Sequence, residues 1–129
     1  MIKPPKDYYI FKKYIDEGKN SIGDYLYFFI RLPLNLIEWI LRDLPGPAGM
    51  LLRRLYYSIL LKRVGKNVLI AEGVYFQGNN IELDDWCYID KFCVFTSISK
   101  IRIGKRVHIG IGTIVHAGLD SEITIDDNT

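Results

Sequence analysis

Ile103-Gly104-Lys105-Arg106-Val107-His108 is followed directly by Ile109-Gly110-Ile111-Gly112-Thr113-Ile114, and the two segments share one pattern. The first position of each six is aliphatic, the second is glycine and the fifth is a small β-branched residue. Related sixes, with Ala or Asp also at the second position, occur earlier in the chain, at 64–69, 70–75, 83–88 and 89–94. A period of six differs from the two-residue alternation of an ordinary strand and indicates a structural repeat.

The repeat restarts at Val64, Leu83, Ile103 and Ile125, which are separated by 19, 20 and 22 residues. Each restart therefore follows three sixes plus one, two or four extra residues, and we expect these to form small loops around 79–80, 99–100 and 121–122. We predict a triangular coil in which each six supplies one short strand and one corner, and three sixes close a turn. Positions one and five point into a shared apolar interior; the fifth positions include Cys87, Cys93 and Leu119.

The segment 1–63 has a different, helical pattern. Over 24–63 the apolar residues recur with the spacing of an amphipathic helix, in which Pro33 should introduce a kink or a break. The prolines and glycine of 44–47 indicate a loop, after which a second helix should run over 48–62. Its apolar positions are Leu51, Leu52, Leu55, Tyr56, Ile59 and Leu60, with Arg53 and Arg54 off that face. The sequence thus predicts an α+β chain with a helical region at 1–63 and a parallel coil of about three turns at 64–129.

The chain has 129 residues, 49% hydrophobic and 25% charged, which is typical of a globular protein. Its net charge of +2 is too close to balance to indicate a nucleic-acid partner. The two regions differ, however: 1–63 carries eleven basic and six acidic residues, and 64–129 carries six and nine. The start lacks the features of a secretory signal, and polar residues interrupt the longest apolar tract, 25–41. We therefore expect a cytoplasmic protein, for which a peripheral position at the inner face of the membrane is left open.

The repeat at 64–129 resembles the left-handed parallel β-helix of the hexapeptide-repeat acyltransferase superfamily. The helical stretch 44–63 running into Val64-Gly65-Lys66-Asn67-Val68 is also similar to the lead-in of its bacterial sugar and exopolysaccharide O-acetyltransferases. This resemblance implies a homotrimer with active sites between adjacent coils, acetyl-CoA as acyl donor, and a sugar hydroxyl of a surface polysaccharide or its lipid-linked precursor as acceptor. The catalytic histidine of these enzymes lies beyond the third coil, so we expect the chain to represent their N-terminal portion.

Two histidines are candidates for the base that acyl transfer to a hydroxyl requires. His108 occupies the sixth position of its six and His116 the second, so both should point outward from the coil. Similarity to the superfamily favours His116, in Val115-His116-Ala117-Gly118, as the catalytic residue, with His108 as the alternative. The competing interpretation is a solvated or interface-packing histidine, because the sequence identifies no carboxylate partner.

The remaining polar and sulfur-bearing residues have structural interpretations. Cys87 and Cys93 should be small interior residues, and their spacing supports neither a disulfide nor a metal site. The pairs Asp84-Asp85 and Asp126-Asp127 recur at the same corner of their coils, which favours turn chemistry over an acid/base pair. Gly104 and Gly110 should be corner glycines.

The basic, aromatic helices leave two roles open. They can seal the open N-terminal end of the coil, or lie on a membrane surface with their cations toward anionic lipid, and both can hold at once. The residues concerned are Arg42, Arg53, Arg54, Lys62 and Arg63 beside Trp39, Tyr56 and Tyr57. A non-catalytic trimerising or membrane-anchoring module is therefore the alternative to an enzyme.

Overall fold

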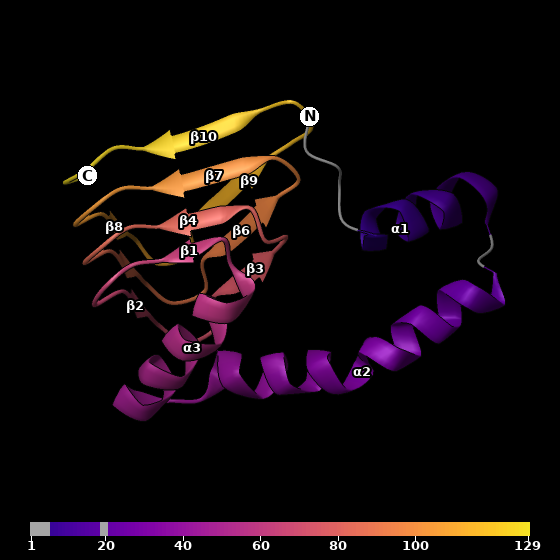
Figure 1. The fold of residues 1–129 in the computed structure, drawn as a ribbon, viewed down its shortest axis with the longest axis horizontal. Helices are drawn as coiled ribbons and strands as arrows, with labels where there is room; N and C mark the ends of the chain where they lie inside the picture. Colours follow the sequence, from indigo (N-terminus) through magenta and orange to yellow (C-terminus); the bar gives the residue numbers. More distant parts are fainter. Residues whose placement is uncertain (1–5, 19–20) are drawn as a thin grey trace.

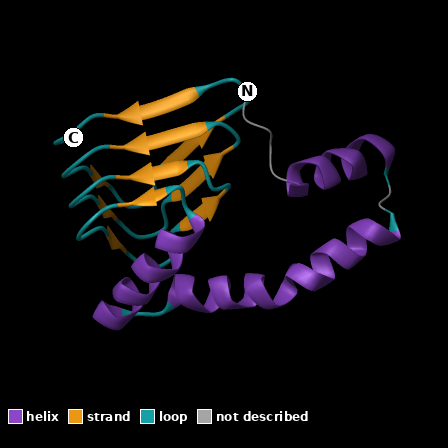
Figure 2. Cartoon of the chain, in the orientation of Figure 1, coloured by secondary structure: helices purple, strands orange, loops and turns teal. Residues whose placement is uncertain are grey.

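The computed structural model describes residues 6–18 and 21–129, and in these it has three helices followed by ten short parallel strands (Figures 1 and 2). The helices are α1 (Lys6–Glu17), α2 (Ile22–Asp43) and α3 (Gly46–Leu60). The strands are β1 (Arg63–Val64), β2 (Leu69–Ile70), β3 (Tyr75–Gln77), β4 (Ile81–Leu83), β5 (Tyr88–Ile89), β6 (Val94–Ser97), β7 (Lys100–Ile103), β8 (His108–Ile109), β9 (Ile114–Ala117) and β10 (Glu122–Ile125). The predicted α+β layout is confirmed.

The strands form a parallel solenoid with three sheets, one on each side of the coil. Their orders are β1-β4-β7-β10, β2-β5-β8 and β3-β6-β9. In the first sheet Val64 pairs with Leu83, Leu83 with Ile103, and Ile103 with Ile125. These are the four restarts of the repeat, so the predicted coil length and register are confirmed. The arrangement is consistent with the left-handed β-helix that the resemblance implies.

The predicted positions form most of the interior of the coil, which also contains Ile81 of β4 and Ile101 of β7. First positions such as Ile70, Ile89 and Phe95 are fully buried, and so are the fifth positions Cys87 and Cys93. The prediction for Leu119 is wrong, because its side chain is 52% exposed. On the third side of the coil the strand continues in simple alternation, so Ala117 at position three fills the interior and Leu119 falls in the loop that follows.

The corners use two different devices. At the corners that follow the first and second sixes of a coil, residues at position four adopt left-handed backbone angles whether or not they are glycine, among them Asn67, Phe92 and Arg106. Gly104, at position two, has no such angle; a Cβ there would overlap Asp127 of the next coil. The Asp127 carboxylate accepts a hydrogen bond of 2.7 Å from the Lys105 backbone N–H, and Asp85 accepts one of 2.8 Å from Lys66. These bonds join corners of neighbouring coils, so the third-position aspartates have a structural role that links coils, and not the local turn role expected of them.

Helix α3 seals the first coil. Tyr57 of α3 and Leu61, which follows the helix directly, belong to the hydrophobic interior of the coil. The centroid of the Tyr57 ring lies 4.6 Å from that of Phe76. Phe76 in turn stacks on Phe95 of the next coil, with ring centroids 5.1 Å apart. The sealing role expected of the helices is therefore present in α3.

Three expectations for the helical region need correction. Arg53 does not lie off the packed face of α3: it is fully buried toward the coil, while the predicted apolar face of this helix is largely exposed. Of the two outcomes expected at Pro33, a kink or a break, the break is wrong: α2 is continuous from Ile22 to Asp43 and starts at a capping box formed by Ser21 and Asp24. The loop before α3 is only Leu44-Pro45, because Pro47 is accommodated in the first turn of the helix. Helix α1 has no counterpart in the predicted helices.

The buried thiols give a direct test of the predicted interior. Burial raises the pKa of the Cys87 thiol to about 12 and also raises that of Cys93, so both are protonated at pH 8 and shielded from reagents. We expect an aromatic disulfide reagent to modify neither thiol of the native chain at pH 8, and both thiols in concentrated urea. Rapid modification of either cysteine in the native chain would contradict the inward orientation of the fifth position.

Candidate functional site

The sheet β2-β5-β8 carries a histidine with a carboxylate partner on its outer face. His108, on β8, pairs in register with Tyr88 on β5, and the two rings lie 4.9 Å apart at an angle of 31°. Asp90 follows β5 directly, and its Oδ2 lies 3.4 Å from Nε2 of His108. The Tyr88 hydroxyl donates to the other oxygen of Asp90 at 3.4 Å. Neighbouring coils thus assemble His108, Asp90 and Tyr88 into one cluster.

The electrostatics of this cluster keep Asp90 ionised. Its pKa is lowered chiefly because the backbone N–H of Lys91 donates to Oδ1 at 2.8 Å, and the His108 ring adds to the effect. Partial desolvation and the adjacent Asp90 carboxylate raise the pKa of the Tyr88 hydroxyl, which therefore stays protonated as a donor. A carboxylate that accepts the Nε2 proton of histidine leaves Nδ1 as the basic nitrogen. The arrangement can therefore act as a general base at an exposed surface.

His116 lies on a different side of the coil. It is exposed on β9, in register with Thr96, and has no hydrogen-bond or ion-pair partner in residues 6–18 and 21–129. The catalytic role that the resemblance favours for His116 stays a prediction. One chain alone does not bring its two histidines together, since they belong to different sheets.

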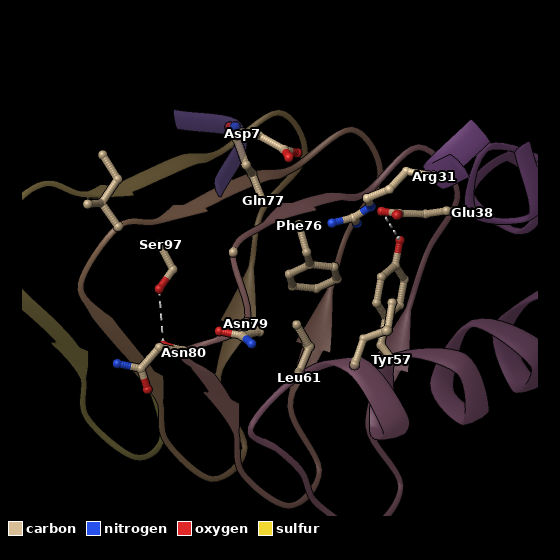
Figure 3. A pocket seen from close by; sticks show the side chains of 13 residues that line it. Asp7, Arg31, Glu38, Tyr57, Leu61, Phe76, Gln77, Asn79, Asn80 and Ser97 are labelled. Atoms are coloured by element: carbon tan, nitrogen blue, oxygen red, sulfur yellow. Dashed lines mark hydrogen bonds between the residues drawn. The ribbon is translucent and has the colours of Figure 1, made fainter. Parts of the chain in front are cut away.

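A cavity of about 410 Å³, lined by both polar and apolar side chains, lies between the helices and the coil (Figure 3). Asp7 of α1 and Arg31 and Glu38 of α2 line one side, and Asn79 and Asn80 of the first inter-coil loop line the other. Tyr57 also lines the cavity; its hydroxyl donates to Glu38 at 3.5 Å, and both burial and this carboxylate raise the Tyr57 pKa. Sequence reasoning missed this cavity.

The cavity leaves one polar atom without a partner. The Oδ1 atom of Asp7 is buried with no hydrogen bond from any of the described residues. The sequence contained one signal for this cavity. Arg31 and Glu38 are seven residues apart and therefore share one face of α2, which indicates that this face meets polar groups.

Other chemistry has little support in the described part of the chain. Residues 6–18 and 21–129 contain no cluster of three or more His, Cys, Asp or Glu side chains that could hold a metal ion. None of the helices in those ranges is long and apolar enough to cross a membrane. Asp84 is buried and lies 3.3 Å from Arg63 and 3.8 Å from Arg102, which favours a structural role for this carboxylate.

Comparison with known proteins adds no assignment: no protein-family model, curated protein or solved structure matches this chain. Any function must therefore be argued from the coil and its side chains.

Proposed function

We propose that this chain acts as an acetyl-CoA-dependent O-acetyltransferase on a sugar hydroxyl of a surface polysaccharide or its precursor. The observation that supports this best is the His108–Asp90 contact on the outer face of a parallel solenoid, the fold that the resemblance to hexapeptide-repeat acyltransferases implies. Within the proposal His108 is the base, because it has the carboxylate partner, and His116 is the alternative.

The proposed step balances without a further co-reactant. Nδ1 of His108 removes the proton from the acceptor hydroxyl as its oxygen attacks the thioester carbonyl carbon. The new C–O bond forms, the C–S bond breaks, and the proton held by His108 passes to the departing thiolate. Asp90 acts through His108 as a positioning residue, since it holds the ring by Nε2 and stabilises the charged imidazolium that forms.

A homotrimer is part of the proposal. The resemblance to hexapeptide-repeat acyltransferases implies active sites between adjacent coils, and the His108 cluster lies on an exposed outer face where a second copy could meet it. We expect light scattering on the purified chain to give three times the mass of one chain. A monomer at all concentrations would contradict the intersubunit site.

The function itself is tested by incubating the chain with acetyl-CoA and a panel of sugars, followed by mass spectrometry of the sugars. The proposal predicts an O-acetylated product that forms only when both the chain and acetyl-CoA are present. A trimer that neither binds acetyl-CoA nor forms product would instead favour the non-catalytic trimerising or membrane-anchoring module.

A further inference from the structure

Helix α2 is amphipathic, but it directs its polar face toward the coil and its apolar face toward solvent. Its polar residues Arg31 and Glu38 face the coil across the cavity, and the Arg42 guanidinium lies 4.6 Å from the Tyr75 ring centroid. None of its 22 residues is buried. Its large exposed apolar side chains are Ile22, Tyr25, Leu26, Phe29, Ile30, Leu32, Leu34, Leu36, Ile37, Trp39 and Ile40. A helix that covers a protein core presents the opposite face to solvent.

Helix α3 repeats this orientation. Arg53 and Tyr57 are buried toward the coil, whereas Leu51, Leu55 and Ile59 on the opposite side of the helix are exposed. Both helices lie at the N-terminal end of the coil, and α2 runs on beyond it (Figure 1). We call these exposed apolar residues of α2 and α3 the outward face. So many large apolar side chains exceed what a soluble surface ordinarily leaves uncovered.

The charge of the helical region indicates what covers the outward face. Residues 1–63 carry a net charge of +5, from eleven basic and six acidic residues. Lys12, Arg54 and Lys62 form no ion pair with any residue of the described ranges, and Arg54 lies one helical turn from Leu51 of the outward face. Anionic lipid attracts such a region, whereas a second copy of the same face would bring two net-positive regions together.

We propose that the outward face of α2 and α3 docks on the surface of an anionic lipid bilayer. The helix α2 lies in the interface plane, with its apolar side chains in the acyl boundary and its polar face toward the coil. Trp39 and Tyr25 belong to the outward face and have the amphipathic rings that favour the headgroup level. The proposal holds whether or not the coil is an enzyme.

Vesicle flotation of the full chain tests the docking. We expect the chain to float with vesicles of phosphatidylcholine and phosphatidylglycerol, and to float poorly with phosphatidylcholine alone. The double variant Phe29→Ser/Ile30→Ser removes outward side chains that are 74% and 73% exposed and should weaken binding by about tenfold or more. The matched control Ile111→Ser/Ile114→Ser removes coil side chains that are 68% and 73% exposed and should change binding by less than about twofold.

A second readout needs no disruptive substitution. The chain has two tryptophans, Trp39 on α2 and Trp86 in the coil, so Trp86→Phe leaves Trp39 as the only one. Its fluorescence should shift to the blue when anionic vesicles are added, and salt should reduce the shift. The proposal would be overturned by an unchanged Trp39 spectrum, or by equal losses of binding in the two double variants. It would also be overturned if the chain fails to bind vesicles and forms an oligomer that Phe29→Ser/Ile30→Ser dissociates. That last result would assign the outward face to a second copy of the chain.

Discussion

Replacing Arg53 with methionine is expected to lower the free energy of unfolding by about 3 kcal/mol, the largest loss of stability that we expect from a single helix residue. Arg53 is fully buried, and its Nε donates to the Ile70 carbonyl at 2.8 Å. Its Nη1 donates to the carbonyls of Leu41 and Leu44 at 3.1 and 2.6 Å. The guanidinium thus joins the end of α2, the turn before α3 and the first coil, and methionine leaves these acceptors without their donor.

Urea unfolding followed by far-ultraviolet circular dichroism measures this loss. Arg54→Met is the matched control, since Arg54 is the next residue of α3 and has no ion-pair partner in the described ranges; its loss should stay below about 0.5 kcal/mol. Arg53→Lys should lose nearly as much as Arg53→Met, because one ammonium group cannot reproduce the planar fork that reaches three carbonyls. Similar midpoints for Arg53→Met and Arg54→Met would contradict the role assigned to Arg53.

The coil could be predicted in detail because its signal is local and repeated. Each six places an apolar residue at position one and a small one at position five, and the restarts at Val64, Leu83, Ile103 and Ile125 directly give the register of the first sheet. Leu119 was misplaced because the third side of the coil ends in a loop of variable length. On that side, exposed and buried residues alternate along β9, so the position within the six no longer tells which side chains point inward.

The orientation of the helices could not be predicted in this way. The usual rule directs the apolar face of a helix inward, which placed Leu51 and Leu55 on the coil and Arg53 outside. The structure reverses this, and Arg53 supplies donors to buried carbonyls that the apolar face could not satisfy. These carbonyls come from segments that are distant in sequence, so the pattern of one helix does not reveal them.

The His108 cluster falls between these cases. His108 and Tyr88 occupy the same position of their sixes, one coil of twenty residues apart, so the repeat itself places the two rings side by side. The register could therefore have located Asp90, two residues after Tyr88, as a carboxylate close to His108. The exact contact depends on side-chain conformations, which the repeat does not specify.

The largest expected effect on activity is that of His108→Gln. If His108 is the general base, the substitution should lower kcat for acetyl transfer by about 100-fold or more with a smaller change in KM, because the base acts in the transition state. Glutamine keeps a polar side chain of similar reach. Because His108 is exposed, we expect the variant to fold normally, so a loss of activity would reflect the loss of the base. Asp90→Asn should lower kcat by about tenfold, since asparagine no longer stabilises the imidazolium.

Within the proposed function, the coil carries an acyl-transfer site built on His108. The most direct test of this claim is the ratio of the turnover numbers of His108→Gln and His116→Gln, measured for acetyl transfer from acetyl-CoA to the same sugar. We predict that His116→Gln stays within about threefold of the unmodified chain and turns over at least about 30 times faster than His108→Gln. Equal turnover of the two variants, or a large loss in His116→Gln alone, would contradict the claim.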